Sequence, residues 1–240
     1  EFLFDQKISV GAPFYNAIFI PIVVLAAIFL FFSVDSKWSR SINFKFISAP
    51  ISFSILLSLA FTLFVMQYFE SQSISVLASI FAGSLIIFRY IYEIINSIFS
   101  KKFINPFSVI AHMSLGLLLI SISFNSLLST ERALSIDLNS TEAYKDLKIS
   151  FKDIGVENNT NYDSIKATFL VEDQTGRTFN LKPEKRRYFT RGQITTETAI
   201  HATLLRDIYI TIGDQLDDGS WIVNIQINYL IRWIWLSALL

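Results

Sequence analysis

The sequence feature that most constrains the fold is a set of long apolar segments with few or no charges. The clearest segment covers residues 104–128, and it contains no charged side chain. A helix rises about 1.5 Å per residue, so this segment would extend about 37 Å, whereas the hydrocarbon core of a bilayer is about 30 Å thick. Similar segments cover residues 14–32, 47–69 and 74–95. We predict that each of the four segments is a membrane-spanning helix.

The composition agrees with a membrane protein. The chain has 240 residues, of which 52% are hydrophobic and 17% are charged, whereas soluble domains average about 25% charged residues. The net charge is zero, so nothing points to nucleic acid, and the lack of cysteine excludes a disulfide framework and thiol exchange by this chain. The chain starts without Met and ends inside an apolar segment at residues 229–240. We therefore expect a fragment of a longer protein with a truncated final span.

The loops between the predicted spans indicate an orientation. Two of them carry cations: Lys37, Arg40 and Lys45 follow the first span, and Lys101 and Lys102 follow the third. The turn after the second span carries no cation. Positively charged loops face the cytoplasm, so the segment after residue 128 is expected outside it, in the periplasm of a bacterium.

Residues 129–228 have the pattern of a β domain. Apolar and polar side chains alternate in residues 147–151 and 165–171, and Asp217-Asp218-Gly219 is a turn signal between two further strands. About 100 residues are enough to bury a core of their own. We predict an α-helical polytopic membrane protein (residues 1–128) with an inserted extracytoplasmic antiparallel all-β domain (129–228), a small barrel or sandwich.

His112 is the most informative single residue, because it lies inside the uncharged segment 104–128. Ionisable groups inside a membrane are costly and are candidate functional sites, and a neutral imidazole is the commonest metal ligand. The alternative is a packing histidine that is hydrogen-bonded to a neighbour such as Ser108 or Ser114. Position alone leaves both interpretations open. The adjacent Met113 points about 100° away along the helix, so we expect it to pack in the core.

Short motifs, in a fixed order and spacing, give the chain a resemblance to a known family. They are Ile8–Asn16 before the first span, Ala111–Gly116 in the fourth, and residues 183–188, 196–200, 206–209 and 232–235 further on. This arrangement resembles the C-terminal part of the CcmF family, membrane subunits of the haem lyase of bacterial cytochrome c maturation. The resemblance covers nearly the whole chain.

The resemblance implies a role for His112 and a set of partners. It implies that His112 is an axial ligand of a b-type haem held in the cytoplasmic membrane between two histidines. It further implies that a second haem arrives from the chaperone CcmE and is attached to apocytochrome c, with the thioreduction subunit CcmH, on the periplasmic side. His201 is the other histidine. We expect it to be an ordinary surface residue, so the second ligand would lie outside this chain.

One part of the family pattern is missing. The family's tryptophan-rich haem-handling segment is absent, because the chain has only Trp38, Trp221, Trp233 and Trp235. We therefore expect that this chain alone does not complete thioether formation.

Three further features have two interpretations each. Arg89 and Glu93 are spaced to pair on one helix face, or Arg89 contacts a haem propionate or lipid phosphate. The cluster Lys185-Arg186-Arg187 is a solvated turn, or it contacts haem propionates or an acidic partner. Small side chains along the fourth span pack against a helix or a macrocycle: Ser108, Ala111, Ser114, Gly116 and Ser121.

Two other functions stay open at this point. The chain could be a membrane-anchored scaffold whose β domain recruits the haem chaperone or apocytochrome without binding haem. Solute transport would need a broken-helix site at the membrane midplane, for which only Pro21 and Pro50 give any indication.

Overall fold

The computed structural model describes residues 12–33, 49–71, 73–101, 103–190 and 192–240. The chain forms two compact units. One is helical, and the other, residues 128–232, is built of strands. The predicted basic loop with Lys37, Arg40 and Lys45 lies outside the described residues.

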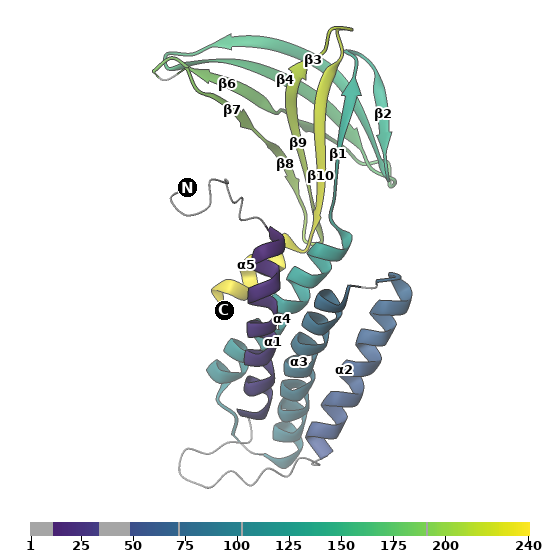
Figure 1. The fold of residues 1–240 in the computed structure, drawn as a ribbon, viewed down its shortest axis with the longest axis vertical. Helices are drawn as coiled ribbons and strands as arrows, with labels where there is room; N and C mark the ends of the chain where they lie inside the picture. The colour runs from purple at the N-terminus through teal and green to yellow at the C-terminus, as the bar shows by residue number, and fades with distance from the viewer. Residues whose placement is uncertain (1–11, 34–48, 72, 102, 191) are drawn as a thin grey trace, which may run out of the picture. The chain divides into compact units, whose positions relative to one another are not determined.

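In its described residues the helical unit has five helices, which Figure 1 labels. They are α1 (Ala12–Ser33), α2 (Ala49–Tyr68), α3 (Ile74–Ser100), α4 (Pro106–Leu128) and the short α5 (Ile231–Leu239). Within the described residues, α2, α3 and α4 are long and apolar enough to cross a membrane. Large apolar side chains such as Leu56 and Phe64 of α2 are exposed, as lipid-facing residues are. We therefore treat these helices as membrane-spanning.

Helices α3 and α4 contact each other through their backbones at a pair of glycines. A Cβ atom placed on Gly83 would lie 2.8 Å from the carbonyl oxygen of Gly116, and a Cβ on Gly116 would lie 2.8 Å from that of Gly83. Small residues permit this close approach where lipid offers no hydrophobic driving force. Apolar side chains pack around the contact, among them Ile86 of α3 and Leu119 of α4. Gly116 therefore has the helix-packing role that the sequence suggested.

The β unit consists of two antiparallel sheets. The first has the strand order β1 (Thr130–Ile136), β10 (Trp221–Tyr229), β9 (Arg206–Gln215) and β8 (Ala199–Ala202). The second has the order β2 (Thr141–Tyr144), β3 (Leu147–Asn158), β4 (Tyr162–Glu172), β6 (Glu184–Tyr188) and β7 (Ile194–Glu197), and β5 (Thr178–Leu181) also pairs with β4. All strand pairs are antiparallel: β1–β10, β10–β9, β8–β9, β2–β3, β3–β4, β4–β5, β4–β6 and β6–β7.

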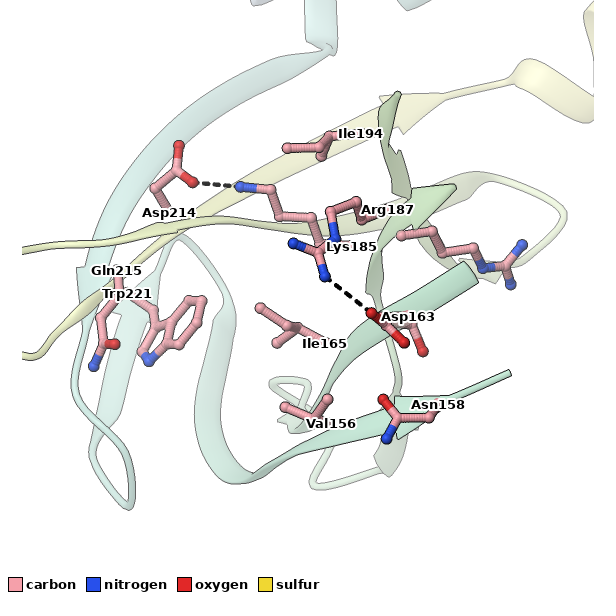
Figure 2. A pocket seen from close by; sticks show the side chains of 12 residues that line it. Val156, Asn158, Asp163, Ile165, Lys185, Arg187, Ile194, Asp214, Gln215 and Trp221 are labelled. Carbon is pink, nitrogen blue, oxygen red and sulfur yellow. Dashed lines mark hydrogen bonds and ion pairs between the residues drawn. The ribbon is translucent and has the colours of Figure 1, made fainter. Parts of the chain in front are cut away.

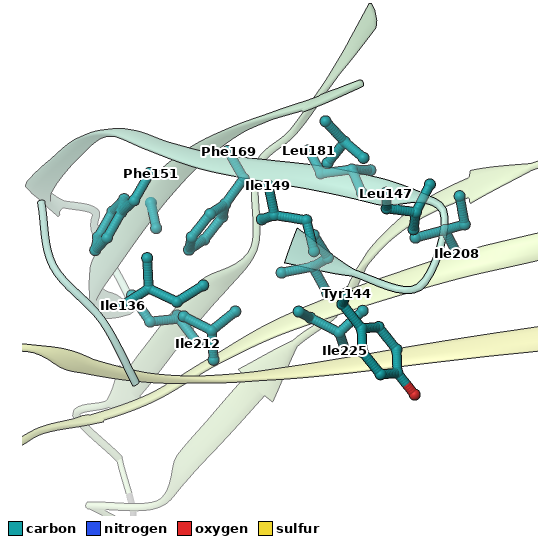
Figure 3. Close-up of a cluster of buried hydrophobic side chains, with 14 of the residues drawn as sticks. Ile136, Tyr144, Leu147, Ile149, Phe151, Phe169, Leu181, Ile208, Ile212 and Ile225 are labelled. Carbon is teal, nitrogen blue, oxygen red and sulfur yellow. The ribbon is translucent and has the colours of Figure 1, made fainter. Parts of the chain in front are cut away.

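The core of the β unit is formed by inward-facing side chains of both sheets (Figure 3). Phe151 and Phe169 stack with ring centroids 4.7 Å apart, and Ile212 and Ile225 of the other sheet join the same fully buried cluster. Every second residue from Ala167 to Val171 is fully buried, as the alternation in the sequence predicts. The predicted fold class, membrane helices with an antiparallel all-β domain, is confirmed.

The β unit begins and ends on neighbouring strands. Strand β1 follows directly on α4, and it pairs along its whole length with β10, which precedes α5. Tyr229 pairs with Arg206 and its backbone N–H donates to Ser129 Oγ at 3.2 Å. These bonds hold Tyr229 in β10, so α5 begins at Ile231, later than the predicted start near Tyr229.

The glycine contact predicts that a single methyl group destabilises the helical unit. We expect Gly116→Ala to lower the unfolding free energy by about 1–3 kcal/mol, because the new Cβ overpacks against the backbone of α3. Thermal unfolding in detergent measures the loss. Gly155→Ala is the control, since a Cβ there meets nothing within 4 Å. Equal stability of the two variants would contradict the backbone contact.

Candidate functional site

The imidazole of His112 is held at one of its two nitrogen atoms. The Tyr90 hydroxyl of α3 is hydrogen-bonded to Nδ1, and Ser108 Oγ, one turn earlier on α4, lies 3.3 Å from the same atom. The Tyr90 and His112 ring centroids are 5.2 Å apart. Ser114, the other predicted partner, instead donates to the Ala111 carbonyl oxygen at 2.7 Å. The contact with Ser108 confirms part of the packing alternative.

The other nitrogen of His112 has a different environment. Among the residues that the structure describes, Nε2 makes no hydrogen bond. Metal-bound histidines have this arrangement: the N–H of one ring nitrogen donates to a neighbouring oxygen, and this fixes the lone pair on the other nitrogen. Both hydroxyl oxygens at Nδ1 are able to accept that bond. The contacts therefore suit a metal ligand as well as a packing histidine.

A cavity of about 330 Å³ adjoins the histidine. Its lining comes from the ends of α1, α3 and α4 and the residues just before α4: Ser33, Tyr90, Glu93, Ile104, Asn105, Ser108, Val109 and His112. His112 therefore borders an open space, and the residues beside it are both polar and apolar.

Arg89 and Glu93 form an ion pair on α3. Arg89 is fully buried, and its Nη1 donates to Glu93 Oε1. A buried guanidinium needs such a partner because desolvation of a charge is costly. The predicted pairing on one helix face is confirmed. Glu93 also lines the cavity beside His112. Contact of Arg89 with an additional anionic group stays a prediction.

The other candidate ligands, His201 and Met113, have packing contacts of their own. His201 lies on β8 in the β unit, where its ring stacks on Phe179 with centroids 3.7 Å apart. Met113 is partly buried against the apolar core of the helical unit, as expected. In the described part of the chain, no group of three or more His, Cys, Asp or Glu side chains could hold a metal ion. Among the described residues, His112 is therefore not part of a cluster of metal-ligating side chains.

Sequence reasoning missed Tyr90. Its hydroxyl group in an apolar helix was a usable signal, because buried tyrosine hydroxyls usually find a hydrogen-bond partner.

The prediction of a solvated turn at Lys185-Arg186-Arg187 is wrong. These residues form strand β6, which pairs with β4 and β7. The charges are tolerated in a strand because each has an acidic partner: Asp214 for Lys185, Glu184 and Glu197 for Arg186, and Asp163 for Arg187. Hydrogen bonds with Tyr188 and Glu184 raise the pKa of the Arg186 guanidinium, so this group stays charged at any pH of interest.

Comparison with known proteins gives one family model and several relatives. Residues 127–228 match the model of the CcmF C-terminal beta-sandwich. The chain is 25% identical over 247 residues to the cytochrome c-type biogenesis protein CcmF of Pseudomonas fluorescens, with 99% of this chain covered. It is 27% identical over 240 residues to CcmF of Escherichia coli (strain K12), with 98% covered. The chain spans 37% of the length of each of these two relatives.

A solved structure has the same fold. The chain matches a structure described as cytochrome c heme lyase CcmF with a TM-score of 0.75 at 12% sequence identity. The match covers 95% of this chain and 38% of that one.

Proposed function

We propose that this chain is a haem-handling part of a membrane protein in cytochrome c maturation. The premise is its resemblance to the CcmF family, which the comparisons confirm. In this proposal His112 is an axial ligand of a b-type haem through Nε2. The observation that carries it is the one-sided hydrogen bonding of the ring, in which Nδ1 is engaged and Nε2 is not, within the described residues. The cavity beside the ring supports it.

Each residue around His112 has a distinct task in this proposal. His112 holds the iron, while Tyr90 and Ser108 orient the ring and fix its tautomer by accepting the Nδ1–H bond. The apolar side chains of α3 and α4 keep water away, and a dry environment tunes a haem potential. When bound, the haem supplies reversible one-electron chemistry at its iron. In this proposal the second axial ligand comes from outside this chain.

The wider role concerns a second haem. We infer that the full protein receives it from CcmE and helps attach it to apocytochrome c together with CcmH. The alternation of cationic loops supports an inner-membrane protein with the β unit in the periplasm, where this attachment would occur.

Removal of the ligand tests the proposal directly. We expect His112→Ala, in the purified full-length protein, to lose most of its b-type haem, because the remaining residues offer no replacement for Nε2. A pyridine haemochrome assay measures haem per protein. The control is His201→Ala, which removes the other histidine of the chain. Unchanged haem content in His112→Ala would refute the ligand role.

Loss of the Tyr90 hydroxyl should weaken haem binding without abolishing it. Outer partners of metal ligands are typically worth about 10–100-fold in affinity, so we expect Tyr90→Phe to weaken haem retention by about tenfold and to shift the haem midpoint potential. Redox titration and haem-transfer kinetics give the two values. Tyr92→Phe is the matched control, because the Tyr92 ring packs against Phe53 of α2. A potential that is identical in both variants would mean that Tyr90 has only a packing role.

A recruitment function of the β unit is the second candidate, and the compactness of that unit favours it. Because β1 and β10 are neighbours, a short linker can replace residues 129–228. We expect this deletion to abolish capture of CcmE or apocytochrome c and to leave the membrane haem in place. Pull-down measures the capture of the partner, and the haem content measures the membrane haem. Retained capture would reject recruitment by the β unit.

A further inference from the structure

A second cavity lies in the β unit (Figure 2). Its volume is about 480 Å³, within the range of about 300–1,000 Å³ that is usual for small-molecule sites. Six strands of the two sheets line it: β3, β4 and β6, β7 from one sheet, and β9 and β10 from the other. The residues proposed to bind haem belong to the helical unit, so this site is independent of them.

One part of the wall is apolar. Trp221, Ile165 and Val156 lie close together in Figure 2, and Ile194 lines the cavity as well. Val156 and Ile194 are 69% and 58% exposed. Apolar side chains exposed in a concave site favour a ligand that removes them from water.

The other part of the wall is cationic. Lys185, Arg186 and Arg187 line the cavity against two carboxylates, Asp163 and Asp214. Arg187 Nη2 donates to Asp163 Oδ2 at 3.0 Å, and Lys185 Nζ donates to Asp214 Oδ1. The side chains of Arg187 and Asp214 are 65% and 82% exposed. Ion pairs with one such exposed partner contribute little to stability, so an incoming carboxylate can take the place of Asp163 or Asp214.

We propose that this cavity binds an amphipathic carboxylate, a small molecule with an apolar body and a carboxylate group. The body packs against Trp221, Ile165 and Val156. The carboxylate accepts hydrogen bonds from Arg187 or Lys185. The apolar body is either a flat ring system or a linear chain, and both types would place the same carboxylate beside the cations.

The test uses the whole chain in lipid nanodiscs with the His112→Ala substitution, so that binding at the membrane site cannot contribute. The probes are 1-naphthaleneacetate, its neutral amide 1-naphthaleneacetamide, and decanoate, each titrated by calorimetry. We expect 1-naphthaleneacetate to bind about tenfold or more tightly than the amide, because a hydrogen bond to a charged group is lost in the amide. Tighter binding of decanoate would identify a linear body, and tighter binding of 1-naphthaleneacetate a flat one.

Two variants should move the affinity in opposite directions. Arg187→Gln should weaken carboxylate binding about tenfold and leave the amide unchanged, whereas Asp163→Asn should strengthen it, because the competing carboxylate is gone. Lys182→Gln is the matched control, since it removes one exposed cation that does not line the cavity. A probe bound in this cavity should quench the fluorescence of Trp221, and this quenching should be absent in Trp221→Phe. Absence of binding, equal affinity for acid and amide, or equal effects of Arg187→Gln and Lys182→Gln would each overturn the proposal.

Discussion

The backbone contact between Gly83 and Gly116 is the constraint on which the site in the helices depends. Tyr90 lies about two turns beyond Gly83 on α3, and His112 lies about one turn before Gly116 on α4. Since the two glycines bring the helix axes close together, the hydroxyl of Tyr90 reaches the imidazole across the interface. Larger side chains at the glycines would increase the distance between the helices, and the hydrogen bond at Nδ1 would be lost. The chemistry of His112 is therefore tied to two residues that carry no functional group.

The sequence predicted the features that depend on local pattern. Long apolar segments predicted the helices, and period-2 alternation predicted strands such as β4. An imidazole within an apolar segment indicated His112 as a candidate site. Tyr90 was missed because its contact with His112 joins residues that are 22 positions apart, and helix packing decides which side chains meet. The strand at Lys185-Arg186-Arg187 was missed for a related reason. Three consecutive charges predict a turn, because their acidic partners are distant in the sequence. These partners include Asp163 of β4 and Asp214 of β9.

The two sites use polar groups in different ways. In the helical unit, one imidazole is oriented by hydroxyl groups of Tyr90 and Ser108 between packed helices, where an exchange of partners would be costly. In the β unit, cations are paired with carboxylates near solvent, where partners exchange readily. The first arrangement suits a permanently held group, and the second suits a ligand that binds and leaves.

The pairing of β1 with β10 also has a mechanical consequence. The connections to α4 and α5 leave this strand pair at the same end, next to the pairing of Thr130 with Ile227. A force that pulled the end of α4 away from the start of α5 would break the ladder one rung at a time, beginning with this pair. Ladders loaded in this direction yield to weak forces, because their hydrogen bonds are never strained together. The Thr130–Ile227 end of the sheet is therefore where the chain arrives from α4 and departs toward α5.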